Sequence, residues 1–431
     1  VVITGRCVDS AVTLGVLMHE FAWTSDQYDL LAAASLAGHI IECGCQATGG
    51  LHTDWDSVPD WPNIGYPIVE CHANGEFVVT KPAGTGGLIT PAVVGEQMLY
   101  EIGDPRAYLL PDVVCDFTGV TITATGENLV TVRGAKGSAP TPFYKVSTTY
   151  MEGFKISAQL TIVGLDAARK AKRTGDAILT RTSNMLDKLG LEAFTGAHVE
   201  VLGAESCYGP NAQTYSPREV ILRVTVTHRR KEALDLFARE VAPAGTSWSP
   251  GTTGSGGGRS SASPSIRQFA FLIDKTQLTP QVHMDGVTMD VAGPVGQAWT
   301  PPPAPASSGT ATVDAIDTVE VPLVRLAWGR SGDKGDPSNI GIIARHPDLL
   351  PWLSATLTAE RVAAWLAHLV KGPVTRYEVA CIGAFNFVCE QALGGGGMAS
   401  LRNDPLGKGM GQIVLSMPIR VPVALLAKLQ C

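Results

Sequence analysis

Residues 143–163 read FYKVSTTYMEGFKISAQLTIV, and this stretch with the residues after it decides the fold class. Aromatic and β-branched residues dominate it and Gly153 interrupts it, which predicts two strands, over 143–150 and 154–163. The apolar spacing then becomes helical, which predicts helices over 166–180 and 182–189. Further patterns follow for strands at 198–203 and 220–228 and for a helix at 231–240. Strands with helices after them predict an antiparallel α+β region.

The part of the chain before this stretch alternates helix and strand patterns. Residues 26–43 place aliphatic side chains on one helical face. A second helix begins with Thr90 as its N-cap and Pro91 in its first turn. Two strand patterns follow, at 113–125 and 128–133. We therefore expect an α/β layer with a mixed sheet to precede the α+β region.

Composition shifts divide the chain into two domains and a linker. Residues 291–318 contain three consecutive prolines, at 301–303, and a Ser-rich end, which is typical of a semi-rigid linker. We expect residues 1–290 to form one domain and residues 319–431 another. The second has strand patterns at 321–328, 339–345, 377–384 and 412–417 and a helical pattern at 358–371. Strands around one face-burying helix predict a small α+β sandwich.

The composition excludes several classes of protein. The 431 residues are 45% hydrophobic and 17% charged with a net charge of −7, so we expect a folded chain that binds no nucleic acid. No run of eighteen apolar residues occurs, so we expect no membrane span. The nine scattered cysteines favour a reducing compartment, the cytoplasm or, in a eukaryote, the mitochondrial matrix. The opening VVITGR resembles the tail of a buried strand, and we expect a fragment cut inside a domain.

Two Gly-rich loops are candidate anion sites. The first joins Lys81 to Thr85, Gly86 and Gly87 just before the helix capped at Thr90. Backbone N–H groups beside a helix start can bind phosphate or carboxylate, although a tight turn explains the glycines equally well. The second loop has the candidate residues Gly254, Gly256, Gly257 and Arg259. A lid or anion cradle there competes with a flexible loop.

Two further polar groups are candidates for the chemistry. Residues 330–339 crowd Asp333 and Lys334 into a turn between apolar strands, and Asn386 follows in the same unit, although a solvated turn is the alternative. Near the start of the chain the candidates are Arg6, Asp9, Ser10, Glu42 and Thr48. Glu42 ends a mostly apolar helix, where the helix dipole disfavours a carboxylate. We therefore expect either a partner for Glu42, with a role as general base, or simply a solvated helix end.

Other kinds of site find less support. His39, Cys43, Cys45 and His52 form a conceivable metal cluster, but their spacing is not that of structural zinc, and we predict no metal. No Gly-x-Ser-x-Gly elbow is present. A nucleophilic thiol at Cys7, Cys43 or Cys207 cannot be told from an inert one.

Several of these stretches resemble the acyclic terpene utilisation protein AtuA family. The resemblance covers nearly the whole chain, in ITGRCVDS (3–10), ECGCQATGG (42–50), PDWPNIGYP (59–67), KPAGTGG (81–87), LPDV (110–113), GAE (203–205) and RSGDKGDPSNIG (330–341). It implies a ferredoxin-like fold for the C-terminal domain and a role in the breakdown of acyclic isoprenoids such as citronellol and geraniol, a pathway of coenzyme A thioesters. Family members usually carry about a hundred further residues first, so the resemblance implies an N-terminally truncated chain.

These observations lead to one main hypothesis and two alternatives. The main hypothesis is a lyase or hydratase acting on a branched acyl-CoA or carboxylate, without a bound cofactor. Its catalytic set would be Glu42 and Asp333 as acid and base, with Lys81, Lys334 and Asn386 as charge or oxyanion support. The first alternative is a non-catalytic assembly or ligand-binding partner of an acyl-CoA carboxylase pathway. The second is a nicotinamide dehydrogenase, which the missing nucleotide fingerprint disfavours. A homo-oligomer is compatible with each.

Overall fold

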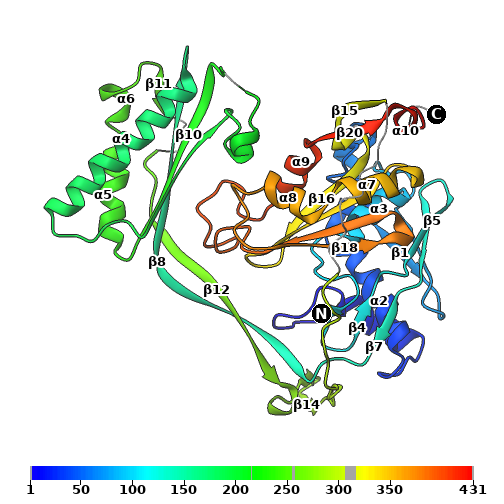
Figure 1. The fold of residues 1–431 in the computed structure, drawn as a ribbon. Coiled ribbons are helices and arrows are strands. Elements are labelled where there is room, and N and C mark those ends of the chain that lie inside the picture. Colours follow the sequence, from blue (N-terminus) through cyan, green and yellow to red (C-terminus); the bar gives the residue numbers. More distant parts are fainter. Residues whose placement is uncertain (1, 215, 255–257, 306–316, 430–431) are drawn as a thin grey trace.

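The computed structural model describes residues 2–214, 216–254, 258–305 and 317–429, arranged in three layers (Figure 1). In Figure 1 most of the layer formed by the middle of the sequence, residues 143–290, lies at the left. The N-terminal and C-terminal layers pack together on the right. Within the described ranges no helix combines the length and the apolar character that a membrane span needs.

The N-terminal layer packs helices on small antiparallel sheets. Its helices are α1 (Ala11–Glu20), α2 (Tyr28–Ile41) and α3 (Pro91–Met98), with short 3-10 turns at Gly44–Thr48, Trp55–Ser57 and Trp61–Asn63. One sheet has the order β1-β2-β6-β5, from β1 (Ile68–Cys71), β2 (Phe77–Thr80), β6 (Leu129–Arg133) and β5 (Thr121–Gly126). A smaller sheet joins β3 (Tyr108–Leu109), β4 (Val114–Asp116) and β7 (Lys136–Ser138).

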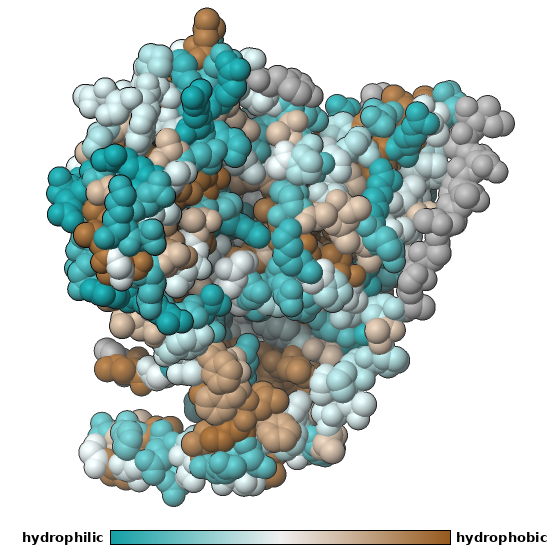
Figure 2. All heavy atoms as spheres, turned by 60° about the vertical axis from the view of Figure 1, so that its left-hand side comes forward, coloured by the Kyte–Doolittle hydropathy of each residue, from teal (hydrophilic) through white to brown (hydrophobic). Residues whose placement is uncertain are grey.

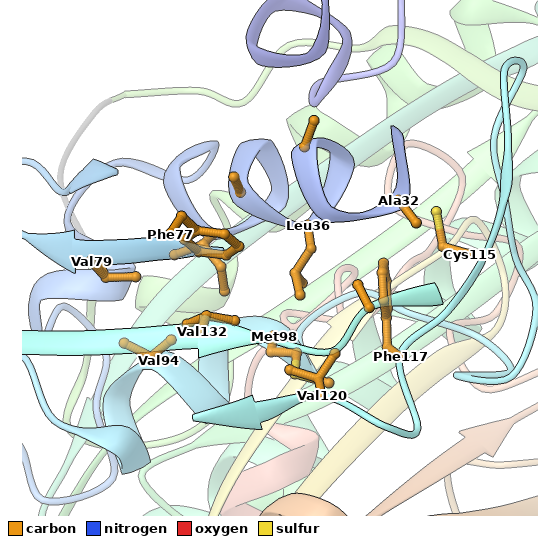
Figure 3. Packing of buried hydrophobic residues seen from close by; sticks show 14 of the residues in the cluster. Ala32, Leu36, Phe77, Val79, Val94, Met98, Cys115, Phe117, Val120 and Val132 are labelled. Atoms are coloured by element: carbon orange, nitrogen blue, oxygen red, sulfur yellow. The ribbon is translucent and has the colours of Figure 1, made fainter. Parts of the chain in front are cut away.

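The core of this layer lies between the helices and the larger sheet. Leu36 of α2 and Met98 of α3 pack with Phe77 of β2 and Val132 of β6, all fully or almost fully buried (Figure 3). The same core takes in Ile343, Val379 and Ala384 of the C-terminal domain. Because the two domains share one apolar core, the surface between them is a permanent interface rather than a hinge.

The middle layer is a long antiparallel sheet covered by helices. Strand β8 (Phe143–Val163) pairs with β10 (Glu219–His228), β11 (Thr252–Gly254) and β12 (Ser263–Asp274), and β9 (Gly196–Leu202) pairs with β10. Helices α4 (Ala167–Lys188) and α5 (Lys231–Val241) bury Ile178, Leu234 and Phe237 against it. A 3-10 turn (Ser206–Asn211) follows β9, the short α6 (Ala244–Ser247) precedes β11, a 3-10 turn (Lys275–Gln277) follows β12, and a hairpin of β13 (Gln281–Met284) and β14 (Val287–Asp290) completes the layer.

The C-terminal layer is an α+β unit around a sheet of order β16-β17-β19-β18. The strands are β16 (Ala327–Asp333), β17 (Ser338–Ala344), β19 (Ala384–Cys389) and β18 (Val374–Val379), and β15 (Thr318–Pro322) pairs with β20 (Pro418–Pro422). The helices are α7 (Leu350–Thr356), α8 (Ala359–Trp365), α9 (Met410–Leu415) and α10 (Val423–Ala427), with 3-10 turns at Leu323–Arg325, Pro347–Leu349 and Ala380–Ile382. One face of the sheet carries the core under the helices, and the other faces α3.

The predicted α+β class is confirmed, but the pairing in the first layer differs from the prediction. Every named strand pair in the described ranges is antiparallel, where a mixed sheet was predicted. The reason is that hairpins connect β1 to β2 and β5 to β6, without the helical crossover that parallel pairing requires. The opening run is no buried strand either, since Val2 and Ile3 are coil and about 90% exposed.

Several predicted boundaries are also wrong. Residues 143–163 form one strand rather than two, because Gly153 lets the backbone of His228 approach: a Cβ there would lie 2.7 Å from the carbonyl oxygen of His228. Residues 167–188 form one helix rather than two. The pattern at 321–328 divides between β15 and β16, and the one at 377–384 covers the end of β18, a 3-10 turn and the start of β19. The predicted strand at 412–417 is mostly helix α9, where the carboxylate of Asp404 accepts N–H groups of Lys408 and Gly409 and so starts the turn.

Candidate active site

A cavity of about 450 Å³ lies between the N-terminal end of α3 and the sheet of the C-terminal domain. Its lining is mostly apolar and comes from both domains: Leu88, Pro91, Ala92, Gly95, Ile122, Trp328, Ile343, Ala344 and Ile382, with the polar residues His52, Asp54, Ser57 and Thr90. A volume of this size and a lining with few polar groups are typical of small-molecule sites.

Helix α3 forms one wall of the cavity because of three residues in its first turns. The hydroxyl of Thr90 accepts the N–H of Val93 at 3.3 Å, and Pro91 follows at the first helical position, as predicted. Gly95 lets the helix lie close to β17, since a Cβ at this position would be 2.9 Å from Cδ1 of Ile343. The positive end of the helix therefore faces the cavity.

A buried histidine–glutamate pair stands at the polar end of the cavity. Nδ1 of His52 lies 2.6 Å from Oε2 of Glu96, and the two residues are 5% and 1% exposed. The backbone N–H of Thr53 donates to Oε1 of Glu96 at 3.2 Å, and its hydroxyl also bonds to this oxygen. Because Glu96 holds Nδ1, the nitrogen that His52 can offer to a ligand in the cavity is Nε2.

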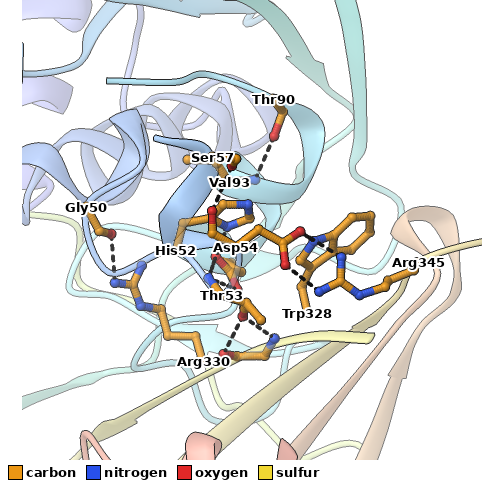
Figure 4. Close-up of polar contacts among 12 residues, drawn as sticks. Gly50, His52, Thr53, Asp54, Ser57, Thr90, Val93, Trp328, Arg330 and Arg345 are labelled. Carbon is orange, nitrogen blue, oxygen red and sulfur yellow. Dashed lines mark hydrogen bonds and ion pairs between the residues drawn. The ribbon is translucent and has the colours of Figure 1, made fainter. Parts of the chain in front are cut away.

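Thr53 connects this pair to the C-terminal domain. The N–H of Gly329, in β16, donates to the hydroxyl oxygen of Thr53 at 2.9 Å (Figure 4). On the next residue of β16, the buried Arg330 donates from Nη2 to the carbonyl of Gly50 at 3.1 Å. Burial lowers the pKa of Arg330. The segment that carries His52 is therefore fixed on both sides by β16.

The same segment brings a second lining residue to the cavity, Asp54, whose carboxylate is paired with Arg345. Nη1 of Arg345 and the indole N–H of Trp328 donate to Oδ2 of Asp54 at 2.7 and 2.6 Å. The guanidinium of Arg345 lies 4.9 Å from the centre of the Trp328 ring. The hydrogen bonds from Arg345, and less strongly that from Trp328, hold the pKa of Asp54 below its ordinary value, against partial burial. Asp54 therefore fixes the cavity wall and is a poor candidate for a proton donor.

This pair gives a testable dependence of stability on pH. The pKa of Asp54 is lower in the folded than in the unfolded chain, so ionised Asp54 stabilises the fold. This stabilisation is fully present above the unfolded pKa and is lost as the pH falls through the folded pKa, below about pH 4. We expect the Tm of Asp54→Asn to fall less between pH 6 and pH 3 than that of the native chain. Asp56→Asn, on the exposed side of the same turn, is the matched control and should follow the native chain. Parallel melting curves of native chain and Asp54→Asn would contradict the assignment.

Four of the predicted site residues meet elsewhere on the domain interface. We call this the charge cluster; it consists of Asp9, His39, Glu42, Glu101, Asp333, Lys334 and Lys408. Nζ of Lys408 lies 2.6 Å from Oε1 of Glu101 and 3.1 Å from Oδ1 of Asp333. Nζ of Lys334 lies 3.9 Å from Oε2 of Glu101. The structure thus brings Asp9, Glu42, Asp333 and Lys334 into one cluster.

Within the charge cluster, Asp9 and Glu42 influence each other, and their pKa values shift in opposite directions. Burial, with the hydrogen bond and charge of Glu42, raises the pKa of Asp9, against Lys334 and the nearby Arg6. Burial also acts to raise the pKa of Glu42, but the hydrogen bonds to His39 and Asp9 and the charge of Lys334 lower it overall. His39 Nδ1 lies 3.1 Å from Oε1 of Glu42. The predicted partner of Glu42 therefore exists: it is His39, with Asp9 close by.

The first Gly-rich loop is a structural turn. The N–H groups of Gly86 and Gly87 donate to the carbonyls of Asn63 and Pro59 at 3.0 and 2.9 Å, so neither is left for an anion. Nζ of Lys81 donates to the carbonyl of Thr85 at 2.6 Å. Thr48, on which this loop packs, is fully buried and donates to the carbonyl of Gly65 at 2.6 Å.

The described residues of the second Gly-rich loop, Gly254 and Arg259, do not line the cavity. Gly254 pairs with Leu160 in the middle layer, at the left of Figure 1, away from α3 and the C-terminal sheet. Arg259 is exposed, and Gly256 and Gly257 lie outside the described residues. Lys81, Glu42 and Gly254 therefore do not line one common cavity.

Asn386 and Ser10 have positions that explain them structurally. Asn386 is fully buried; its amide donates to the carbonyls of Ile102 and Gly103 at 3.2 and 2.7 Å, and its oxygen accepts from Asn339 at 2.9 Å. It has no free donor for the predicted oxyanion role. Ser10 is buried against Gly38 of α2 and makes no side-chain cap of α1.

The disfavoured metal cluster and two of the undecided thiols can now be placed. In the described ranges no three His, Cys, Asp or Glu side chains converge to hold a metal ion. Burial raises the pKa of Cys43 to about 11 and also raises that of Cys207, so both thiols stay protonated near neutral pH and are weak nucleophiles.

Sequence reasoning missed the His52–Glu96 pair. In the sequence, His52 belongs only to the disfavoured metal cluster, and Glu96 belongs to no candidate site. One local signal is present: Glu96 lies inside the mostly apolar helix PAVVGEQM. A carboxylate is rarely buried in such a helix unless it has a partner.

Comparisons with known proteins agree on the family. Residues 1–284 match the model of the acyclic terpene utilisation family protein AtuA, and residues 321–420 match the AtuA ferredoxin-like domain. No curated protein and no solved structure matches the chain. With both of its domains matched over most of their length, the chain belongs to the AtuA family of acyclic terpene utilisation proteins.

Proposed function

We propose that this chain catalyses a lyase- or hydratase-type step on an acyl-CoA or free carboxylate with a branched aliphatic chain, in the breakdown of acyclic isoprenoids. One observation carries the proposal: His52 lines a mostly apolar cavity of about 450 Å³ and is paired, at Nδ1, with the buried Glu96 behind it. Few other polar groups line this cavity, so an aliphatic chain would be bound by apolar contact and its head group oriented at the polar end.

The pair has the chemistry of a general base. Nε2 of His52 would take the proton from the carbon next to the carbonyl, and the imidazolium that forms would be stabilised by the carboxylate of Glu96 at Nδ1. The proton would then be returned to the departing hydroxyl, which leaves as water; hydration is the same sequence in reverse. Such a step needs no redox cofactor.

The helix start supplies the second requirement, which is stabilisation of the carbonyl oxygen as it gains negative charge. Thr90, Pro91 and Ala92 line the cavity at the positive end of α3, and the hydroxyl of Thr90 already accepts the N–H of Val93. An oxyanion at this end would be favoured by the helix dipole and by the N–H of Ala92, since Pro91 has no N–H and those of Val93 and Val94 bond to Thr90.

The charge cluster remains the rival location for the acid and base. Asp9 and Glu42 have pKa values that move in opposite directions, which is how one carboxyl becomes an acid and the other a base. Its lysines are held by Glu101 and Asp333, and the cavity lining does not include it. We therefore place the chemistry at His52 and let variants of Glu42 test the alternative.

The test is turnover by the purified full chain. We expect it to add water to, or remove water from, at least one branched CoA thioester or free acid, which mass spectrometry detects as a change of one water. In D₂O we also expect deuterium to enter the carbon next to the carbonyl, which NMR detects even without net reaction. Straight-chain thioesters of equal carbon number are the control. Binding of the branched compounds with neither water transfer nor exchange would reject the enzyme and favour a ligand-binding partner.

A further inference from the structure

A two-stranded ribbon connects the middle layer to the rest of the protein. We define the ribbon as residues 143–153 of β8 with residues 265–274 of β12, which pair from Phe143 opposite Asp274 to Met151 opposite Ile266. Strand β10 pairs with β8 only from Phe154 onward, and β11 only at the far end. Between the layers the ribbon therefore has no further strand beside it among the described residues (Figure 1).

One face of the ribbon is apolar. Opposite residues of an antiparallel pair share a face, so Tyr144, Val146 and Thr148 lie on the same face as Ile273, Phe271 and Phe269. The rings of Phe269 and Phe271 stack, with centroids 6.1 Å apart. They are 55% and 43% exposed. On this face Tyr144, Val146 and Ile273 are half-buried, whereas Thr148, Phe269 and Phe271 are exposed.

Apolar exposure continues into the adjoining hairpin. Large apolar side chains that are at least 42% exposed in the ribbon and hairpin are Phe143, Tyr150, Met151, Phe269, Phe271, Leu272, Val282, Met284, Val287 and Met289. Figure 2 shows hydrophobic residues gathered at the lower end of the molecule, where the ribbon and the hairpin lie. Tyr150, Phe269 and Phe271 lie on one face of the ribbon, while Phe143, Met151 and Leu272 lie on the other. At about half exposure, three aromatic side chains of about 150–250 Å² each offer on the order of 300 Å² on that face. A standard interface covers about 800 Å² on each partner, so the hairpin would have to supply much of the remaining contact.

The charges of the ribbon indicate what covers it. Lys145 and Arg267 balance Glu152 and Asp274, and Arg267 is paired with Glu152 within the ribbon. The ribbon therefore has no net charge that would attract an acidic or a basic partner. A neutral apolar face with open strand edges can instead meet its own copy, the usual arrangement in symmetric dimers.

We propose that the ribbon is the surface on which a second copy of this chain docks, with apolar face against apolar face. Burial of both copies' Phe269 and Phe271 would remove the aromatic surface from water, and the contact would stabilise a ribbon that is marginal as two strands alone. The proposal is independent of the cavity, since no ribbon residue lines it.

The test is the oligomeric state of the full chain by sedimentation at several concentrations. We expect a dimer for the native chain and a monomer for the double variant Phe269→Lys, Phe271→Lys, with the dissociation constant raised about 100-fold or more. The control replaces two exposed apolar residues elsewhere, Val12→Lys and Leu165→Lys (69% and 78% exposed), and should stay dimeric. A native chain that is monomeric up to about 100 µM, or a double variant that still dimerises, would overturn the proposal.

A second measurement covers the case in which the double variant does not fold. Hydrogen exchange of the native chain should show slower exchange of the ribbon amides at high than at low protein concentration, while amides of β10 stay unchanged. Equal exchange of the ribbon amides at both concentrations would reject self-association through the ribbon. The same result is expected if a different protein binds the ribbon.

Discussion

Replacement of His52 by Asn is expected to lower turnover about 10²- to 10⁴-fold, the usual contribution of a general base. Asn is chosen because its amide can still donate to Glu96 from near the position of Nδ1, so that the buried carboxylate keeps a partner. The thermal unfolding midpoint should therefore change little. The measurement is the rate of α-deuterium exchange and of water transfer, with the Tm of the same preparation.

Three further variants locate the loss of activity. His283→Asn, in the exposed hairpin where His283 bonds to Thr288, is the matched control and should keep full activity. Glu96→Gln keeps the shape but removes the charge that orients His52, and should lower turnover about 10- to 100-fold. Glu42→Gln should keep most of the activity. If Glu42→Gln abolishes turnover and His52→Asn does not, the chemistry belongs to the charge cluster.

Replacement of Asn386 by Leu is expected to lower the free energy of unfolding by about 2–4 kcal/mol. The change removes the donors to the carbonyls of Ile102 and Gly103 and the acceptor for Asn339, all at the domain interface. Each buried polar group left without a partner costs about 1–3 kcal/mol, and Leu returns part of this through apolar burial. Denaturant unfolding of the full chain measures the difference.

The control for this prediction is Asn403→Leu, an exposed position, where the change should stay within about 0.5 kcal/mol. A loss below about 1 kcal/mol for Asn386→Leu would mean that the interface does not depend on this amide. Its effect on turnover distinguishes structure from chemistry: after correction for the folded fraction, the activity of Asn386→Leu should equal that of the native chain.

Local signals predicted the elements that local physics controls. Thr90 and Pro91 mark the start of α3 because a cap and a proline act within one turn. Residues 231–240 nearly coincide with α5, since its apolar residues recur at helical spacing. The predictions fail where distant residues decide: Gly153 continues a strand because His228 lies beside it, and α9 is a helix although its short apolar run suits either state.

The candidate site was predictable only in part, for the same reason. Asp333 and Lys334 could be predicted as candidates because four charged residues in one turn are unusual. The structure places both residues in the charge cluster with Asp9 and Glu42. The pairing of His52 with Glu96 spans 44 residues and is completed by Gly329 through Thr53, 276 residues away. No local pattern contains such a contact.

The amino-acid sequence by itself determined the family, the α+β class, and most helices and strands, because motifs, caps and apolar periods are properties of neighbouring residues. Only the tertiary structure decided which polar residues meet, that the N–H groups of Gly86 and Gly87 bond to the carbonyls of Asn63 and Pro59, and that Phe269 and Phe271 of the ribbon stay exposed. The physical reason is that burial and hydrogen-bond partners depend on contacts between segments far apart in the chain, which exist only once both domains are packed on one core.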